Sequence, residues 1–318
     1  MKKPLLILTG PTAVGKTALS IRAAKAFGGE IISADSMQVY QYMDIGSAKV
    51  TKEEMAGISH HLIDVLRPEE PFHVVKFQSM AKEAINGIYE RGHLPILTGG
   101  TGFYIQALLY DIDFTENDAD TGYRERLERL AEERGAGYLH QMLRERDARS
   151  AEDIHENNIK RVIRALEFYE KTGKPISEHN QAEREKESPY QFAYVVLFRD
   201  RTELYERIDL RVDKMMKDGL LDEVRHLREM GYTRDMVSMR GLGYKELLAY
   251  LDGETTLSEA VRILKRDTRH FAKRQLTWFK RERQTDWVSM DGRLEEEILL
   301  DIEDIMRKRM VTSGRTNG

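Results

Sequence analysis

The stretch LLILTGPTAVGKT, residues 5–17, decides the fold of this chain. Its first part, residues 5–9, is a short apolar run that is typical of a buried strand. Gly10 to Thr17 then match the pattern G-x-x-x-x-G-K-[ST]. The following residues up to Phe27 carry apolar side chains at helical spacings, and Gly28 is a helix stop. The stretch therefore predicts a strand, a phosphate-binding loop and a helix in succession.

The chemistry of such a loop explains its residue types. Glycines let the backbone curl around an anion without Cβ clashes, and the loop amides and the helix N-terminus point at phosphate oxygens. Lys16 supplies a positive charge, and the Thr17 hydroxyl can hold Mg²⁺. A chance match in a chain this long has a probability of about 1%. The predicted phosphate ligands are Gly10, Pro11, Thr12, Ala13, Val14, Gly15, Lys16 and Thr17. The loop alone indicates a di- or triphosphate, so a kinase or another NTPase stays open at this point.

Three further apolar runs extend the pattern, at residues 30–35, 94–98 and 192–198. Helical segments follow them, one beginning near Phe103. Strands that alternate with helices predict a parallel sheet with helices on both faces. The expected fold class is α/β, with a P-loop-type sheet core flanked by helices.

The middle of the chain differs from this pattern, because it is helical, charged and almost free of strand signals. We expect a helical insertion domain at residues 115–188. The catalytic core then consists of residues 1–114 and 189–310, and its later part is a helical block that includes 204–230 and 257–283. The last eight residues, 311–318, are expected to be a disordered tail.

Composition narrows the function class. The chain has 41% hydrophobic and 33% charged residues, as soluble globular proteins do. It has no cysteine, which excludes disulfides, thiolate zinc sites and cysteine nucleophiles. No apolar run is long enough to cross a bilayer, and residues 5–9 are too short for a signal peptide. The net charge of −4 argues against indiscriminate nucleic-acid coating but allows a local basic groove.

Two polar segments follow predicted strands, where ligands of open α/β sheets bind. Asp35 ends the run 30–35, and either a catalytic role or a helix-capping or turn role suits it. Thr101 lies in the glycine-rich stretch 99–102, which suggests close approach of a ligand or a tight turn. The pair His60-His61 favours a packing or loop role, since adjacent histidines cannot easily face one metal.

Positive charge is concentrated in one segment. Residues 262–283 hold nine Lys or Arg and two acidic residues, which gives +7 over 22 positions. Lys160, Arg161 and Arg164 form a smaller cluster in the insertion. A basic helix is often only a solvated face over a core, but this charge density is also a credible footprint for nucleic-acid phosphates.

Together these segments resemble the tRNA isopentenyl/dimethylallyl transferases of the bacterial type. The matching stretches run in order from residue 10 to residue 281: GPTAVGKT (10–17), SADSMQVY (33–40), MDIGSAK (43–49), HHLID (60–64), GGTGFY (99–104), NIKRVIRALE (158–167), DKMMKDGLLDEV (213–224), RGLGYKE (240–246) and RQLTWFKR (274–281). The chain departs from the family pattern at Tyr42, Ser47 and Val50, where Gly, Thr and Pro are common. None of the three replaces a group with a chemical role.

The resemblance implies a reaction. A member of this family transfers the dimethylallyl group from dimethylallyl diphosphate to N6 of adenine 37 in the anticodon stem-loop of tRNAs that read codons beginning with U. By this resemblance Lys16, the loop amides and Mg²⁺ at Thr17 stabilise the leaving diphosphate, with Arg211 as a second clamp. Asp35 is the implied general base, and Thr101 orients it or the leaving oxygen.

The resemblance also implies the tRNA contacts. They are Asp35, Ser36, Met37, Gln38, Thr101, Tyr123, Ile159, Lys160, Arg161, Val162, Ile163, Arg240, Gly241, Leu242, Gly243, Tyr244 and Lys245. A monomer in the cytoplasm, without a membrane partner, is the expectation. Two rivals remain from the residues themselves: a P-loop kinase of a small metabolite or nucleotide, and a non-catalytic RNA-binding protein with a vestigial loop.

Overall fold

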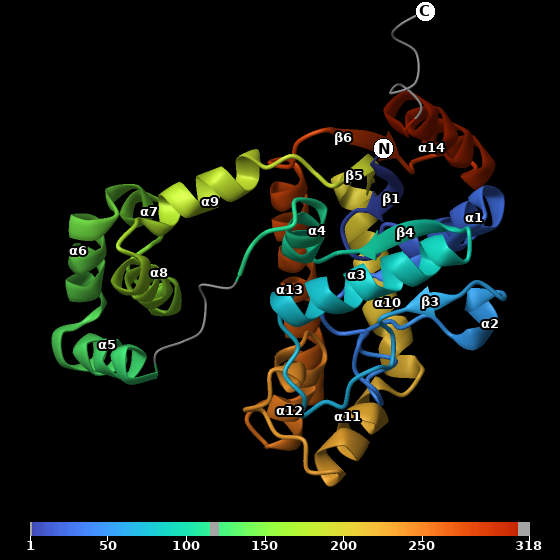
Figure 1. Cartoon of the computed structure of the whole chain (residues 1–318). Helices are drawn as coiled ribbons and strands as arrows, with labels where there is room; N and C mark the ends of the chain where they lie inside the picture. Colours follow the sequence, from blue (N-terminus) through green and yellow to red (C-terminus); the bar gives the residue numbers. More distant parts are fainter. Residues whose placement is uncertain (1, 115–120, 311–318) are drawn as a thin grey trace, which may run out of the picture. The chain divides into compact units, whose positions relative to one another are not determined.

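The computed structural model describes residues 2–114 and 121–310 (Figure 1). The tail 311–318, expected to be disordered, lies outside the described residues. The chain divides into two compact units, one made of 1–108 and 189–318 and the other of 109–188. The smaller unit thus begins at Leu109, before the expected insertion boundary at residue 115.

The larger unit is built on a parallel sheet with the strand order β3-β2-β4-β1-β5-β6. The strands are β1 (Lys3–Thr9), β2 (Gly29–Ser33), β3 (His60–His61), β4 (Leu94–Gly99), β5 (Tyr190–Phe198) and β6 (Thr285–Ser289). The predicted α/β fold class is confirmed. The sequence did not predict β3 and β6, because both are short edge strands without a long apolar run.

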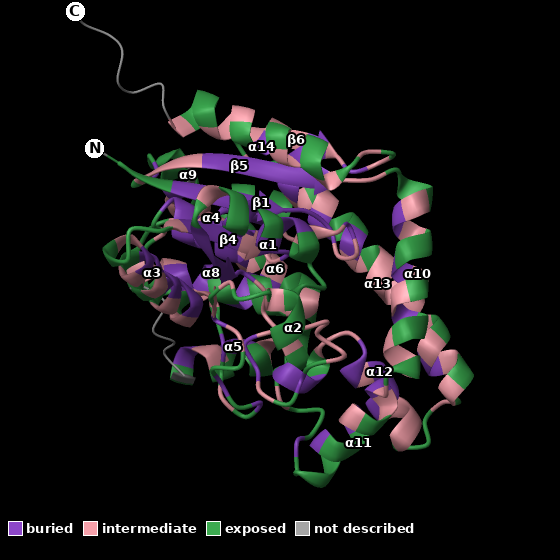
Figure 2. Cartoon of the chain, turned by 90° about the vertical axis from the view of Figure 1, so that its right-hand side faces the viewer, coloured by how far each residue is buried: buried purple, intermediate pink, exposed green. Residues whose placement is uncertain are grey.

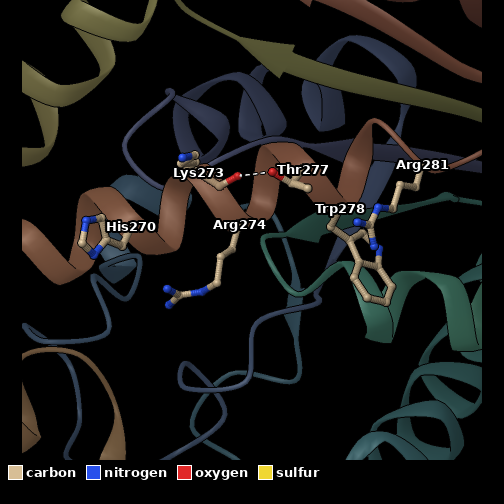
Figure 3. A pocket seen from close by; sticks show the side chains of 6 residues that line it. All are labelled: His270, Lys273, Arg274, Thr277, Trp278 and Arg281. Carbon is tan, nitrogen blue, oxygen red and sulfur yellow. Dashed lines mark hydrogen bonds between the residues drawn. The ribbon is translucent and has the colours of Figure 1, made fainter. Parts of the chain in front are cut away.

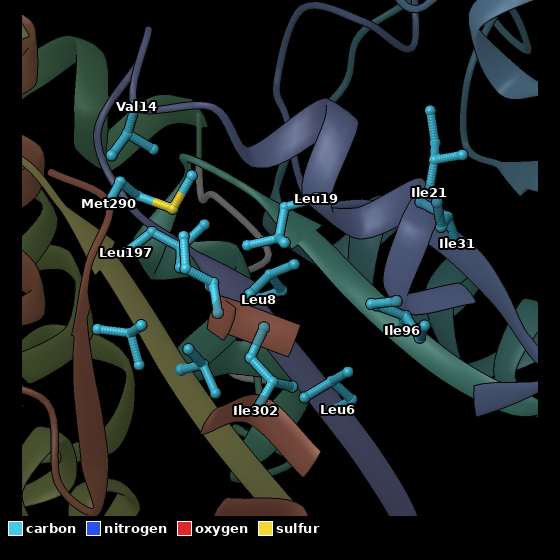
Figure 4. Packing of buried hydrophobic residues seen from close by; sticks show 14 of the residues in the cluster. Leu6, Leu8, Val14, Leu19, Ile21, Ile31, Ile96, Leu197, Met290 and Ile302 are labelled. Atoms are coloured by element: carbon cyan, nitrogen blue, oxygen red, sulfur yellow. The ribbon is translucent and has the colours of Figure 1, made fainter. Parts of the chain in front are cut away.

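One face of the sheet packs against α1 (Lys16–Phe27) and α14 (Glu295–Met310). Leu6 and Leu8 of β1 join Leu19 of α1 and Ile302 of α14 in one buried cluster (Figure 4). Full burial of each such side chain contributes about 1.5–3 kcal/mol. This cluster anchors the start of α1, and therefore the phosphate loop that precedes it.

The other face is covered separately. Leu5 and Ile7 alternate with Leu6 and Leu8 and are also fully buried, so they point to the opposite face. There α3 (Val74–Glu90) packs on β2 and β4. Its Phe77 stacks on Tyr104 of α4 (Gly102–Leu109), with ring centroids 4.6 Å apart. Figure 2 shows that the central parts of β1, β4 and β5 are buried as a result.

The later helices of this unit are α10 (Arg201–Lys217), α11 (Leu220–Glu229), η2 (Ser238–Arg240), α12 (Tyr244–Leu251) and α13 (Leu257–Phe279). The short α2 (Lys52–Met55) lies between β2 and β3. The helical stretch expected at 204–230 is broken at Gly219, whose φ of +104° suits glycine and ends α10. No helix among the described residues is long and apolar enough to span a membrane.

The described part of the smaller unit consists of helices and the loops that connect them. It contains α5 (Thr121–Arg134), α6 (Ala136–Arg146), α7 (Ala148–Asp153), α8 (Ile159–Thr172) and α9 (Ile176–Glu185). Its own core includes Leu127, Leu139 and Leu166. The buried carboxylate of Asp147 accepts the amides and hydroxyls of Ser150 and Ser177, which ties α9 to α7.

Candidate active site

The phosphate loop lies at the carboxyl end of β1, between Thr9 and Lys16. Gly10 has φ +151°, and a Cβ there would overlap the carbonyl of Leu197 on β5. Gly15 has φ +114°, and Ala13 adopts φ +64° although it is not glycine. Backbone in this region curls into a concave nest of amides, the shape that binds anions. The predicted loop is therefore present in the context that the motif requires.

Lys16 folds back over this loop. Its Nζ donates to the carbonyls of Gly10 and Pro11, both at 2.8 Å. Burial and the positive charge of Arg211 together lower the pKa of Lys16 to about 7, against the opposing effect of the negative charge of Asp35. An anion in the loop would restore the full charge of this ammonium group.

Arginines of α10 and its N-terminal flank surround the loop. Arg211 donates to the Thr12 hydroxyl at 3.4 Å, and burial lowers the pKa of its guanidinium, with Asp35 opposing. Arg207 donates to the Ala13 carbonyl and Arg199 to the Val14 carbonyl, each at 3.0 Å. The structure thus brings Arg211, Lys16 and Asp35 together. Sequence reasoning missed Arg207 and Arg199, although the spacing 207/211 places two arginines on one helix face.

Asp35 follows β2 at the same edge of the sheet. Its Oδ1 accepts the amides of Met37 at 2.8 Å and Gln38 at 3.4 Å, which is an Asx turn. Among the described residues, Oδ2 has no hydrogen-bond partner. The two roles considered from the sequence are therefore compatible, because one oxygen shapes the turn and the other can accept a proton.

The second glycine-rich loop lies beside this turn. The amide of Thr101 donates to the Ala34 carbonyl at 3.2 Å, and a Cβ on Gly99 would overlap that carbonyl. Thr101 is half-buried, and the residue to which its amide is bonded, Ala34, directly precedes Asp35. The predicted catalytic residues Lys16, Asp35 and Thr101 therefore share one edge of the sheet.

The segment 240–245 meets the loop after Asp35. Glu223 of α11 accepts the amides of Asp44, Ile45 and Gly46 at 2.7–3.0 Å and the Tyr244 hydroxyl at 2.8 Å. A Cβ on Gly46 would lie 2.5 Å from the Tyr244 ring. Glu223 was not predicted, and its only sequence signal is its place in the family-like stretch 213–224.

Several predicted tRNA contacts have side chains that cannot reach RNA as they stand. Tyr244 is fully buried, and Val162 and Ile163 belong to the core of the smaller unit. Tyr123 is nearly buried as well. Apolar and aromatic side chains at these positions pack inward, so Val162, Ile163 and Tyr244 offer little or no side-chain surface to RNA.

The other predicted contacts are more open. Lys160, Arg161 and Arg240 are exposed, whereas Ser36, Met37, Gln38, Ile159, Leu242 and Lys245 are half-buried. The methyl of Met37 lies against Gly241, so that a Cβ there would come within 2.5 Å of it. Gly243 opens α12 with φ +93°. The segments 35–38 and 240–245 are therefore in contact within the larger unit.

The basic helix α13 is divided into two halves. In its first half Lys265 pairs with Asp213 and Arg269 with Asp209. In the second half and just past its end at Phe279, an open pocket is lined by His270, Lys273, Arg274, Thr277, Trp278 and Arg281 (Figure 3). Within residues 2–114 and 121–310, Lys273, Arg274 and Arg281 form no ion pair. The positive face suited to phosphate is thus narrower than the charge count predicts.

Few side chains of the described residues at this site could bind a metal ion directly. Thr17 is exposed at the start of α1, as a Mg²⁺ ligand of a phosphate loop must be. No cluster of three His, Cys, Asp or Glu side chains that could hold a metal occurs in the described part of the chain. These residues fit an ion held mainly by phosphate oxygens and water, with one protein hydroxyl.

Comparison with known proteins gives one family throughout. The family model for IPP transferases matches residues 38–282, and that for isopentenyl transferases matches residues 3–72. A tRNA dimethylallyltransferase of Lachnoclostridium phytofermentans is 60% identical over 310 residues, which cover 97% of this chain and 99% of that protein.

Solved structures agree with this match. The full-length tRNA isopentenylpyrophosphate transferase of Bacillus halodurans is 43% identical with a TM-score of 0.75, and the match covers 99% of this chain and all of that one. A eukaryotic dimethylallyltransferase acting on tRNA is 28% identical with a TM-score of 0.81, over 99% of this chain and 82% of that one. Neither a small-molecule kinase nor a vestigial RNA-binding protein accounts for these likenesses. The chain belongs to the IPP transferase family and is a prenyltransferase of tRNA.

Proposed function

We propose that this enzyme transfers the dimethylallyl group from dimethylallyl diphosphate to N6 of adenine 37, in the anticodon stem-loop of tRNAs that read codons beginning with U. The observation that carries this proposal is the grouping of Lys16 and Arg211 around the phosphate loop with Asp35 close enough to act on the pKa of both. Two cations for a leaving diphosphate and a carboxylate for a proton are what the reaction needs.

The loop binds the donor through its diphosphate. The loop amides that are not already bonded within the protein face the phosphate oxygens, and Lys16 and Arg211 add two positive charges in a partly buried site. Mg²⁺ held at the Thr17 hydroxyl would neutralise charge that develops on the diphosphate oxygens. Lys16 moves from the carbonyls of Gly10 and Pro11 to the phosphate when the donor binds.

The transfer exchanges one bond for another. The allylic C1–O bond breaks, its electron pair leaves with the diphosphate, and the lone pair of the adenine N6 forms the new N6–C1 bond. The nitrogen then carries an extra proton, which passes to Oδ2 of Asp35. Oδ1 stays bound to the amides of Met37 and Gln38, so the carboxylate keeps its orientation. Thr101 holds its hydroxyl near the reacting atoms.

RNA binding uses the open basic surfaces of each unit. In the larger unit we assign tRNA phosphates to Lys273, Arg274 and Arg281, and the nucleotides around adenine 37 to the segments 35–38 and 240–245. In the smaller unit Lys160 and Arg161 offer exposed charge at the start of α8. The target adenine must leave its stack to reach Asp35, and RNA loops are bound through such splayed bases.

The test is a transfer assay with purified protein, Mg²⁺, labelled dimethylallyl diphosphate and unmodified tRNA. After nuclease digestion, mass spectrometry should detect N6-dimethylallyladenosine. A tRNA with guanine at position 37, and tRNAs reading other codons, should give none. Asp35→Asn should lower kcat about 100-fold or more, whereas the control Asp304→Asn, at a half-buried carboxylate of α14 that pairs with Lys308, should not. Product at another adenine, or full activity of Asp35→Asn, would contradict the position or the base assignment.

A further inference from the structure

A single side chain of α13 joins the two glycine-rich loops of the site. The Oε1 atom of Gln275 accepts the amide of Thr12 in the phosphate loop at 2.9 Å. The Nε2 atom of the same side chain donates to the carbonyl of Gly100 at 3.0 Å. Gln275 is only 6% exposed, so both bonds are formed away from bulk solvent. A buried amide with both ends bonded has one defined orientation.

This contact depends on glycine at the second loop. A Cβ on Gly100 would overlap the Gln275 amide, and a Cβ on Gly102 would overlap the indole of Trp278, one helical turn further along α13. Glycine at these two positions lets α13 lie directly on the loop backbone. The loop 99–102 therefore takes its position from α13 as well as from β4.

Among the described residues, Gln275 is the one side chain that is hydrogen-bonded to both loops. The last pair of the sheet at this edge is Thr9 with Gly99, where the Thr9 hydroxyl donates to the Gly99 carbonyl at 2.6 Å. Beyond that pair, the hydrogen bonds of the described residues connect 10–17 with 99–102 through Gln275. On its far side the loop binds the Ala34 carbonyl through the Thr101 amide, directly before Asp35.

We propose that Gln275 is a positioning residue that fixes the separation of the phosphate loop from the loop 99–102, and thereby the distance from the leaving diphosphate to Asp35. The chain of contacts runs from Thr12 through Gln275 to Gly100, and from Thr101 through Ala34 to Asp35. Gln275 itself touches no reacting atom. Because α13 also carries the open basic face, RNA bound to that face and diphosphate bound to the phosphate loop would both affect the position of Gln275. The effect on catalysis rests on the proposed transferase function.

The kinetic test uses Gln275→Met, which keeps the length of the side chain and removes both hydrogen bonds. Misplacement of reacting groups lowers kcat while ground-state binding is kept, so we expect kcat to fall about 10- to 100-fold with the donor KM within about threefold. Gly100→Ala disturbs the same contact from the loop, and should give a similar loss. The double variant should lose no more than the larger single loss, since both remove one interaction.

The matched control is Gln78→Met. Gln78 is also a buried amide that donates to a backbone carbonyl, that of Ala107 at 2.9 Å. It should lower Tm without lowering kcat. Equal loss of kcat in Gln78→Met, or an unchanged kcat in Gln275→Met, overturns the proposal. If Gln275→Met does not fold, Gln275→Glu applies the same criterion, because it can still accept from Thr12 but cannot donate to Gly100.

A second readout is independent of the transfer reaction. The chain has two tryptophans, and in a Trp287→Phe background the fluorescence comes from Trp278 beside Gly102. Addition of magnesium diphosphate should change this emission, and Gln275→Met should abolish the change while equilibrium dialysis still shows bound diphosphate. An unaltered change in Gln275→Met overturns the proposal. If the wild type forms no modified tRNA but shows this signal, the proposed function fails and the inference on Gln275 stands.

Discussion

The carboxylate of Glu223 on α11 accepts the hydroxyl of Tyr244 on α12 at 2.8 Å. The same carboxylate accepts three successive amides, of Asp44, Ile45 and Gly46. It occupies a backbone nest of the kind that otherwise binds free anions. It therefore holds the loop after Asp35 against the segment 240–245.

Substitution of Glu223 should weaken the binding of tRNA but not the binding of diphosphate. In Glu223→Gln one acceptor oxygen becomes an NH2 group, and bonds to a charged group are worth about 1.5–3 kcal/mol each. We expect the KM for tRNA to rise about tenfold or more, with diphosphate affinity unchanged in a dialysis measurement. Glu229→Gln, exposed on the same helix, is the control and should leave the KM for tRNA unaltered. Equal effects of both variants would count against a specific role.

Diphosphate binding should depend on pH through Lys16. The pKa of this group is lowered to about 7 by burial, so at pH 8 most of the empty enzyme carries a neutral amine. Binding an anion favours the charged form, so diphosphate should bind with proton uptake at pH 8 and with less uptake at pH 6. Calorimetry in buffers of different ionisation enthalpy measures this uptake. Subtraction of the Lys16→Met titration isolates the contribution of Lys16, and equal uptake in the two proteins would contradict it.

Acid stability should depend on Glu30 at the opposite edge of the sheet. A paired hydrogen bond from Arg91, with His61 and His93, lowers the pKa of this buried carboxyl from 4.5 to about 2. A lowered folded-state pKa stabilises the protein above the unfolded pKa, and this stabilisation is lost as the pH falls from 4.5 toward 2. Urea unfolding should show that Glu30→Gln lowers the free energy of unfolding by about 3 kcal/mol at pH 7. At pH 3 the same substitution should lower it by only about 1 kcal/mol. A difference that does not vary with pH would show that ionisation is not the cause.

Tyr42 carries backbone strain that glycine would relieve. Its φ is +65°, in the left-handed region, and its side chain is 44% exposed. Non-glycine residues pay about 1–2 kcal/mol there, while glycine adds entropy to the unfolded chain. Tyr42→Gly should therefore stabilise the protein by up to about 1 kcal/mol, measured as a rise in Tm of a few degrees. Tyr42→Ala keeps the Cβ and should give no rise, so stabilisation by alanine would point to the side chain instead.

The salt dependence of tRNA affinity should separate the two halves of α13. Each phosphate contact that is lost reduces the slope of log K against log salt by about 0.7–0.9. Lys273→Gln, Arg274→Gln and Arg281→Gln should each show this reduction, since these groups are open and unpaired among the described residues. Lys265→Gln should show little, because Lys265 already pairs with Asp213. Filter binding from 50 to 300 mM salt, roughly, gives the slopes.

The parts of the site that could be predicted from the sequence are those whose residues are neighbours along the chain. The phosphate loop is encoded within eight neighbouring residues, so Gly10, Lys16 and Thr17 could be placed from local pattern alone. Arg211 required the family resemblance, because nothing local connects it with Thr12, its partner 199 positions away.

The rest of the site depends on contacts that no local pattern contains. Gln275 sits on the inward face of a basic helix, where a polar residue among Ala272, Leu276 and Phe279 is a weak signal. Its bond to Thr12 spans 263 positions and becomes visible only when the helix is docked. Val162, Ile163 and Tyr244 show the converse, because a motif match places a segment near a ligand without saying which side chains point inward.

The division into units bears on the order in which the chain can fold as it is synthesised. The smaller unit is one continuous stretch with its own core, complete once residue 188 has left the ribosome. The central strand β1 can pair with β4 early, but its other edge must wait for β5, which begins at Tyr190, and β6 comes later still. Domains emerge and fold from the N-terminus onward, yet here the sheet that begins with the N-terminal strand is completed only by β5 and β6. One edge of β1 therefore stays without its partner strand for more than half of the synthesis of the chain.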